Sequence, residues 1–168
     1  IIEAVHRIAM DSQPDAVGAV GQANVWPNSR NVIPGQVKFS IDLRNVNDEL
    51  LNTMHEEMLA FVARTRAQTG LAIEIERVSY YPPCPFHPDC VNAVRAATDK
   101  LGYSTMDVVS GAGHDAIYAA RVAPSGMIFV PCKDGISHNE IEDAKPEHLE
   151  AGCNVLLHAM LERAGVAE

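Results

Sequence analysis

The sequence predicts a mixed fold in two parts, in which an antiparallel α+β unit precedes part of an α/β domain. Apolar and polar residues alternate at 36–44 and again at 71–80, and a long amphipathic segment lies between them, which is typical of an antiparallel sheet backed by helices. After the stretch YPPCPFHPD at 81–89, which carries four prolines, short apolar segments alternate with helical ones, as in an α/β layer. We therefore expect a first unit at 1–82 and a second at 83–168.

Local signals define the elements of the first unit. Ile1, Val5 and Ile8 have helical spacing, whereas the later helix has Asn47 or Asp48 as its cap and ends at Gly70. The expected elements are a helix at 1–11, strands at 16–25 and 36–44, a helix at 48–70 and a strand at 71–80.

The second unit is expected to alternate between helices and strands. Gly102 ends its first helix, and the apolar run GMIFVP predicts a strand. The expected elements are a helix at 89–101, a strand at 104–109, a helix at 114–121, a strand at 126–131 and a helix at 146–164.

Composition excludes several function classes. The chain has 168 residues, 47% hydrophobic and 21% charged, with a formal net charge of −9. This acidic balance, without a basic stripe, argues against nucleic acid and anionic membranes as partners. The four cysteines fit neither a CxxC redox pair nor a zinc knuckle, so we expect a reduced, cytoplasmic protein. Because the chain opens within a helical pattern and without Met, we also expect it to be a fragment of a longer protein.

Two short motifs are candidates for a functional site. In SGAGHDA at 110–116, Gly111 and Gly113 allow close backbone approach, and His114 could donate a hydrogen bond to a carboxylate or an oxyanion. A plain glycine-rich turn explains this motif about equally well. In KDGISHNE at 133–140, His138 follows an apolar strand, where α/β sheets place ligands. Taken alone, His138 is more simply explained as a solvated loop residue than as a metal ligand.

A third candidate lies in the first unit. Arg44 lies on the polar face of a predicted strand and could bind a carboxylate through two hydrogen bonds, and Asn31 could add an amide donor. An ordinary surface arginine and a turn asparagine are the simpler interpretation of these two residues alone.

The order of four segments resembles one protein family. The segments NVIPG…DLR, SGAGHDA, MIFVPCKDGISHNE and HLEAGCNVLLHAML are similar to those of the hydantoinase/carbamoylase branch of the M20 metallopeptidases. That branch includes N-carbamoyl-L-amino acid hydrolases, β-ureidopropionases and allantoate amidohydrolases. The resemblance implies that 1–82 is a lid and dimerisation domain lacking its first strand, and that 83–168 is the C-terminal part of a catalytic α/β domain.

The resemblance also implies a site and a reaction. His138 matches the last ligand of a two-ion centre of Zn, Mn, Co or Ni, whose other ligands and general base lie upstream of this sequence. Asn31, Arg44 and Gly113 match substrate-binding positions, and His114 is expected to face the substrate. The implied activity is hydrolysis of N-carbamoyl amino acids by a homodimer, and this chain alone is expected to be inactive. Allantoate hydrolysis, a peptidase-like activity and a non-catalytic binding or dimerisation module are the alternatives.

Overall fold

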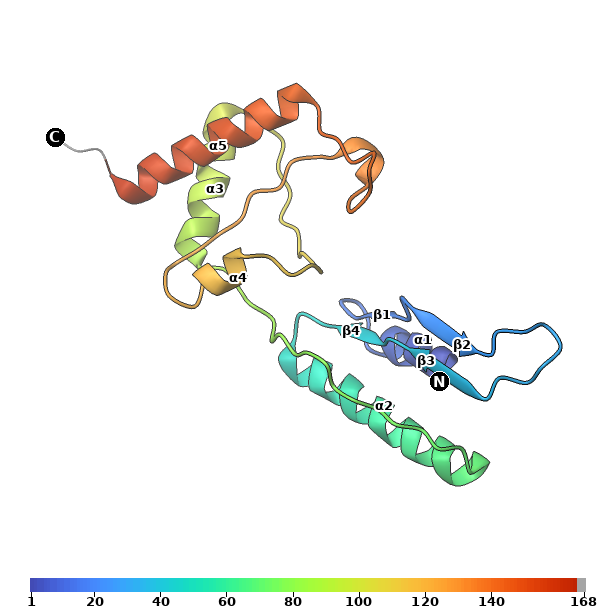
Figure 1. Ribbon diagram of the computed structural model, residues 1–168. Helices are drawn as coiled ribbons and strands as arrows, with labels where there is room; N and C mark the ends of the chain where they lie inside the picture. The colour runs from blue at the N-terminus through green and yellow to red at the C-terminus, as the bar shows by residue number, and fades with distance from the viewer. Residues whose placement is uncertain (166–168) are drawn as a thin grey trace. The chain divides into compact units, whose positions relative to one another are not determined.

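The computed structural model describes residues 1–165 and divides into two compact units, Ile1–Pro83 and Cys84–Glu168. Figure 1 shows the elements of each unit. The fold is mixed, with helices and small antiparallel sheets, as the sequence predicts. The identity of the units as lid and catalytic domain stays a prediction.

A bent hairpin forms the sheet layer of the first unit. Its strands are β1 (Val17–Ala19), β2 (Ala23–Trp26), β3 (Gln36–Phe39) and β4 (Asp42–Arg44). Strand β2 pairs with β3, and β1 pairs with β4, both antiparallel. Between the two ladders, residues 20–22 lie opposite residues 40–41, so one side carries an extra residue. Such a bulge interrupts pairing and bends the hairpin, and it divides each of the two long strands expected at 16–25 and 36–44.

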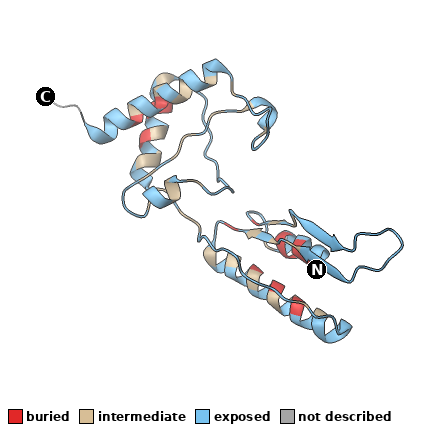
Figure 2. Cartoon of the chain, viewed as in Figure 1, coloured by how far each residue is buried: buried red, intermediate tan, exposed pale blue. Residues whose placement is uncertain are grey.

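Two helices pack on one face of this hairpin. They are α1 (Ile2–Asp11) and α2 (Asp48–Thr69). Met54, Met58 and Val62 recur every four residues along α2 and are buried against α1, as Figure 2 shows in red. The Asn47 side chain caps α2 by accepting from the backbone N–H groups of Glu49 and Leu50. This helix therefore begins and ends close to where its cap and stop signals predict.

The second unit is built around two packed helices. They are α3 (Pro88–Leu101) and α5 (Pro146–Ala164), with a short α4 (Ala116–Ala119) and a 3-10 turn η1 (Lys133–Gly135) between them. The core consists of small and β-branched residues from both long helices: Ala93, Ala97, Val155 and Ala159. Small side chains allow the two helices to approach closely.

Three strands expected from the sequence are absent from the described part of the chain. Segments 71–80, 104–109 and 126–131 are extended but form no β ladder. An extended segment becomes a strand only when a neighbour satisfies its backbone N–H and C=O groups, and residues 1–165 supply no neighbour for these three. Several of their apolar side chains are exposed, with Val78 at 89% and Met106 at 78%, whereas Ile73 and Ile128 are partly buried against the two cores.

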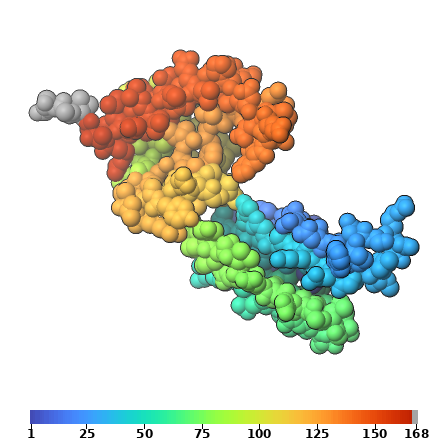
Figure 3. Space-filling view, viewed as in Figure 1, coloured from blue at the N-terminus to red at the C-terminus, as the bar shows by residue number. Residues whose placement is uncertain are grey.

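Side chains anchor these extended segments instead. Tyr80 donates a hydrogen bond from its hydroxyl to the Asp48 carboxylate, so that 71–80 runs along α2, as Figure 3 shows. Arg95 of α3 pairs with Asp107 at 2.5 Å.

All four cysteines are unpaired. Among the described residues, no helix is both long and apolar enough to cross a membrane.

Candidate functional site

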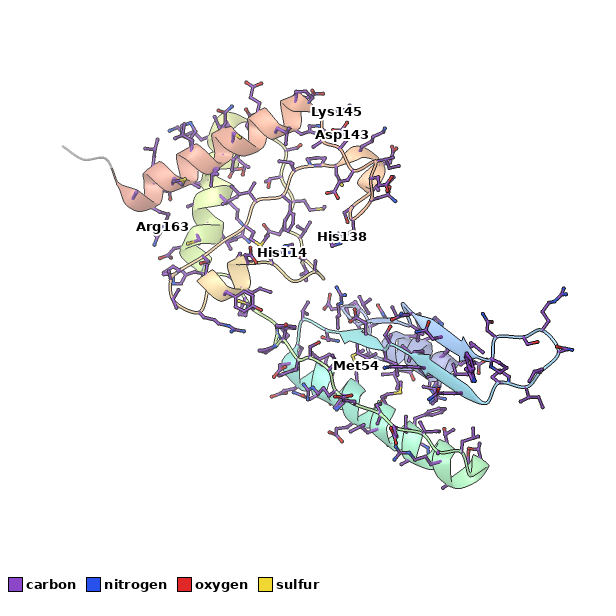
Figure 4. All side chains as sticks on the ribbon, viewed as in Figure 1. Met54, His114, His138, Asp143, Lys145 and Arg163 are labelled. Atoms are coloured by element: carbon purple, nitrogen blue, oxygen red, sulfur yellow. The ribbon has the colours of Figure 1, made fainter. Side chains whose placement is uncertain are left out.

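The loop that carries His138 is closed at its base and held along its length. The backbone N–H of Lys133 donates to the carbonyl oxygen of Asp143 at 2.7 Å. Within the loop, the N–H of Glu142 donates to the carbonyl oxygen of Asn139 at 3.0 Å, and the N–H of Ile141 donates to Oδ1 of Asn139 at 3.2 Å. In Figure 4, His138 lies at the end of this loop farthest from Asp143. The loop therefore presents His138 at a fixed turn.

His138 adopts a backbone conformation that few residues other than glycine use. Its φ is 56°, in the left-handed region, where a non-glycine residue costs about 1–3 kcal/mol and persists only when its surroundings hold it there. The bond that holds it is direct: the His138 backbone N–H donates to Oε2 of Glu142 at 2.8 Å. A charged acceptor makes such a bond stronger than one to a neutral oxygen. Strain and bond together point to a position whose imidazole has a set direction.

The donor chemistry of His138 fits one corner of a metal centre. The side chain is exposed, and imidazole nitrogen is a common ligand of divalent transition metals. No group of three or more His, Cys, Asp or Glu side chains within residues 1–165 is arranged to hold a metal ion. This chain therefore offers one ligand, and a complete centre would need donors from elsewhere.

The glycine-rich turn forms a second polar feature of this unit. Ser110 Oγ lies 2.6 Å from Nε2 of His114, and it also accepts from the Ala112 backbone N–H at 3.2 Å. The His114 ring meets Phe129 edge to face, with centroids 5.6 Å apart. These contacts orient the His114 imidazole from both sides.

The helix expected at 114–121 is shorter than predicted, because α4 covers only Ala116–Ala119. The backbone N–H groups of Ile117 and Tyr118, at the start of α4, donate to the carbonyl oxygens of His114 and Asp115. These two N–H groups are therefore already paired. A group that binds at this turn would meet the His114 ring and the backbone around Gly113.

Gly113 is a glycine without a local structural reason. Its φ is not in the left-handed region, and a Cβ built on it would meet nothing within 4 Å. Gly126 differs, because a Cβ there would lie 3.1 Å from Cβ of Cys90. Since neither backbone conformation nor packing requires glycine at 113, the open space is suited to close approach by an outside group.

In the first unit, Arg44 is held by its neighbour Asp42. Residues two apart on a strand share a face, and Arg44 Nε lies 3.0 Å and 3.2 Å from the two Asp42 oxygens, with Nη2 at 2.5 Å. This hydrogen bond, more than the charge itself, lowers the pKa of Asp42 and raises that of Arg44, against the opposing effect of burial. Both side chains remain 48% exposed. The pair presents a preset guanidinium on the hairpin face opposite Leu43, which packs against the core.

Asn31 lies in the loop between β2 and β3, where Ser29 Oγ donates to its Oδ1 at 2.8 Å. Arg44 is the last residue of β4, and Figure 1 shows β4 and the loop between β2 and β3 at opposite ends of the hairpin. From Gln36 to Arg44 the chain advances about 3.3 Å per residue, a separation of roughly 25 Å. At this separation Asn31 and Arg44 of one copy do not meet at a single carboxylate, and the substrate-binding role expected of each residue stays a prediction.

Three partner residues escaped the sequence analysis: Asp42, Ser110 and Glu142. Asp42 could have been found, because strand alternation puts it on the same face as Arg44. The contact of Glu142 with His138 depends on the left-handed conformation of His138, which the sequence pattern does not predict. His114 and His138 both belong to the second unit, and in Figure 4 both lie on the side away from α5.

Comparison with known proteins gives this arrangement a context. The model of Peptidase family M20/M25/M40 matches residues 3–162. An N-carbamoyl-L-amino-acid amidohydrolase of Rhizobium meliloti is 48% identical over 168 residues, which are all of this chain and 40% of that protein. An allantoate amidohydrolase of Bacillus subtilis is 34% identical over 155 residues, covering 90% of this chain and 38% of that protein.

A solved structure agrees with these relatives. An amidase of the hydantoinase/carbamoylase family from Burkholderia multivorans superposes with a TM-score of 0.93 at 53% sequence identity. The match covers 99% of this chain and 41% of that one. The chain thus spans about two fifths of the length of the proteins it resembles.

Proposed function

Because the chain belongs to Peptidase family M20/M25/M40, we propose that it is part of a metal-dependent amidohydrolase that cleaves the C–N bond of ureido substrates. The preferred substrate class is N-carbamoyl-L-amino acids, which water converts to the free amino acid, CO2 and ammonia. The observation that carries this proposal is the 48% identity, over the whole chain, to an N-carbamoyl-L-amino-acid amidohydrolase. The set conformation of His138 and the open space at Gly113 support it.

In this proposal His138 supplies one imidazole to a pair of divalent ions, Zn, Mn, Co or Ni. The other donors and the general base belong to the remaining three fifths of a protein of the relatives' length. When bound, such ions provide an activated water at neutral pH and polarise the ureido carbonyl. The contribution of this chain is geometric, because the loop around His138 fixes the backbone from which the ring projects.

Substrate recognition is assigned to three places in the chain. Arg44 binds the α-carboxylate through its guanidinium, which Asp42 orients by accepting from Nε and Nη2. The backbone at Gly113 admits the ureido group closely, and His114, oriented by Ser110, donates a hydrogen bond to its oxygen. Asn31 is retained as a separate polar contact, because it does not reach the carboxylate bound by Arg44 in the same copy.

Residues 1–82 act in this proposal as a lid that also mediates homodimerisation, and 83–168 as the C-terminal part of the catalytic domain. A cytoplasmic location accords with the unpaired state of the four cysteines. No nucleic acid or membrane partner is proposed for so acidic a chain, whose net charge is −9.

Allantoate is the second candidate substrate, because one relative at 34% identity is named for it. A peptidase-like activity and a non-catalytic dimerisation module complete the alternatives. The two ureido substrates differ in the group next to the ureido nitrogen, so a direct comparison of their rates separates them.

The test is a hydrolysis assay on a protein that contains this chain and has the full length of the relatives. We call this the protein of relatives' length. Ammonia and amino acid release is measured with N-carbamoyl-L-amino acids, allantoate and a dipeptide, before and after chelation. We expect metal-dependent turnover that is fastest with an N-carbamoyl-L-amino acid. Faster turnover of allantoate or the dipeptide would assign the protein to that reaction, and no turnover with bound metal would favour the binding module.

A further inference from the structure

We propose that Glu142 is a positioning residue that sets the direction of the His138 imidazole. The proposal rests on the proposed function, in which His138 is a metal ligand. Three observations carry it: His138 has a φ of 56°, its backbone N–H donates to Oε2 of Glu142 at 2.8 Å, and the loop is closed at its base by the bond between Lys133 and Asp143.

The contact acts on the backbone of His138, not on its ring. A residue in the left-handed region returns to an extended or helical conformation when nothing holds it. Such a change in φ would swing the Cα–Cβ bond and move the imidazole away from its present position. By accepting the N–H, the Glu142 carboxylate favours the backbone conformation that gives the Cα–Cβ bond, and with it the attachment point of the ring, its observed direction.

Glu142 reaches His138 because the intervening residues fold back. The bonds from Ile141 and Glu142 to Asn139 form a compact turn, which returns the chain so that a side chain four residues later meets the His138 N–H. The imidazole itself makes no hydrogen bond within residues 1–165 and stays exposed. The carboxylate therefore fixes the residue while leaving both ring nitrogens to outside groups.

Glu140 provides a matched control. It lies in the same exposed loop and carries the same charge, but the carboxylate that accepts from His138 belongs to Glu142. Replacing either glutamate with alanine removes one negative charge near His138. Only Glu142→Ala removes the acceptor, whereas Glu142→Gln keeps an oxygen that can accept the same hydrogen bond without the charge.

The first measurement uses the 168-residue chain and needs no metal. Amide hydrogen exchange at His138 reports opening of this hydrogen bond. We expect exchange to be about tenfold faster in Glu142→Ala, and close to that of the unmodified chain in Glu142→Gln and Glu140→Ala. Equal exchange in Glu142→Ala and the unmodified chain would overturn the proposal, as would an equal acceleration in Glu140→Ala.

The second measurement counts Zn²⁺ bound by the protein of relatives' length and measures its affinity by competition with a chelator. Loss of residues that orient a ligand typically weakens metal binding about 10–100-fold, so we expect this loss for one ion in Glu142→Ala. Glu142→Gln should restore most of the affinity, and Glu140→Ala should keep it. Affinity in Glu142→Ala equal to that of the unmodified protein would refute the positioning role.

The same experiment separates this inference from the function on which it rests. His138→Ala should lose one of two ions. If the unmodified protein binds no Zn²⁺, or if His138→Ala keeps both ions, the assignment of His138 as a ligand fails and the positioning role fails with it. If His138→Ala loses an ion while Glu142→Ala does not, the ligand assignment stands and only the role of Glu142 is rejected.

Discussion

Gly18 of β1 lies directly against Ala9 of α1, and a Cβ added at Gly18 would lie 2.8 Å from the Ala9 Cβ. The same Cβ would lie 3.0 Å from the backbone oxygen of Val5. Neither neighbour is the end of a flexible side chain, so relief would require α1 to move away from the hairpin. The absence of a side chain at position 18 is therefore a condition for packing in the first unit.

We accordingly expect Gly18→Ala to destabilise the first unit by about 1–3 kcal/mol, the usual cost of overpacking. Gly35→Ala is the matched control, because a Cβ there meets nothing within 4 Å and Gly35 belongs to the same hairpin. Urea denaturation followed by circular dichroism measures both. Equal stability of the two variants would show that α1 yields more easily than this packing indicates.

A second prediction concerns acid. The Arg44 hydrogen bond holds the pKa of Asp42 below its ordinary value of 3.8. A lowered folded-state pKa stabilises the fold above the unfolded-state value, and this contribution disappears as pH falls through the folded value. The gain is at most about 1 kcal/mol, because exposed ion pairs are screened by solvent.

Asp42→Asn should therefore be less stable than the unmodified chain at pH 7, and the difference should disappear as pH falls below 3.8 and through the lowered folded-state pKa of Asp42. Urea midpoints at several pH values measure this difference, and Arg44→Gln should reproduce it from the other side of the pair. A stability difference that grows toward low pH would contradict the assigned sign.

The helices show what local sequence can predict. Asn47 and Gly70 bracket α2 because capping and helix termination depend on a few neighbouring atoms. The segments 71–80, 104–109 and 126–131 have sequences suited to a sheet, yet they form no ladder among the described residues. Alternation indicates that a segment fits a pleated surface, whereas pairing also requires a partner, which no local pattern reveals.

In the candidate site too, the sequence predicts some residues and not others. The residue types of His138, His114 and Arg44 made them visible in the sequence as chemically capable groups. Their orienting partners Glu142, Ser110 and Asp42 depend on turn and strand geometry, and only the Asp42 contact follows from a simple spacing rule. The separation of Asn31 from Arg44 depends on the length of the hairpin between them.

A third prediction concerns this chain by itself. No cluster of three metal-binding side chains exists within residues 1–165, and a single imidazole binds a divalent ion weakly. After dialysis, elemental analysis of the 168-residue chain should therefore find far less than one equivalent of Zn, Mn, Co or Ni. Its hydrolysis of an N-carbamoyl-L-amino acid should not exceed the rate in buffer. Two bound ions with turnover would show that the chain holds a complete centre.

A fourth prediction tests the open space at Gly113. Because a Cβ there meets nothing within 4 Å, Gly113→Ala should change the stability of this chain by no more than about 0.5 kcal/mol. In the protein of relatives' length, the same methyl group should obstruct substrate and lower kcat/KM by at least about tenfold. Denaturation and steady-state kinetics measure the two effects separately. Unchanged kinetics would remove Gly113 from the binding site.

The last prediction concerns recognition of the substrate carboxylate by Arg44. Hydrogen bonds to charged groups contribute about 1.5–3 kcal/mol, which corresponds to roughly 10–150-fold in binding. In the protein of relatives' length, Arg44→Ala should raise KM for N-carbamoyl-L-amino acids by about this factor. The value of kcat should change little, because the guanidinium contacts a part of the substrate that does not react. Arg44→Lys should give an intermediate KM, since an ammonium keeps the charge but lacks the planar pair of donors.

The decisive control is the matching N-carbamoyl amino acid amide, whose carboxylate is replaced by a neutral group. If Arg44 binds the carboxylate, the unmodified protein and Arg44→Ala should have similar KM values for this amide. An equal rise in KM for acid and amide would instead show that the substitution disturbs the hairpin as a whole.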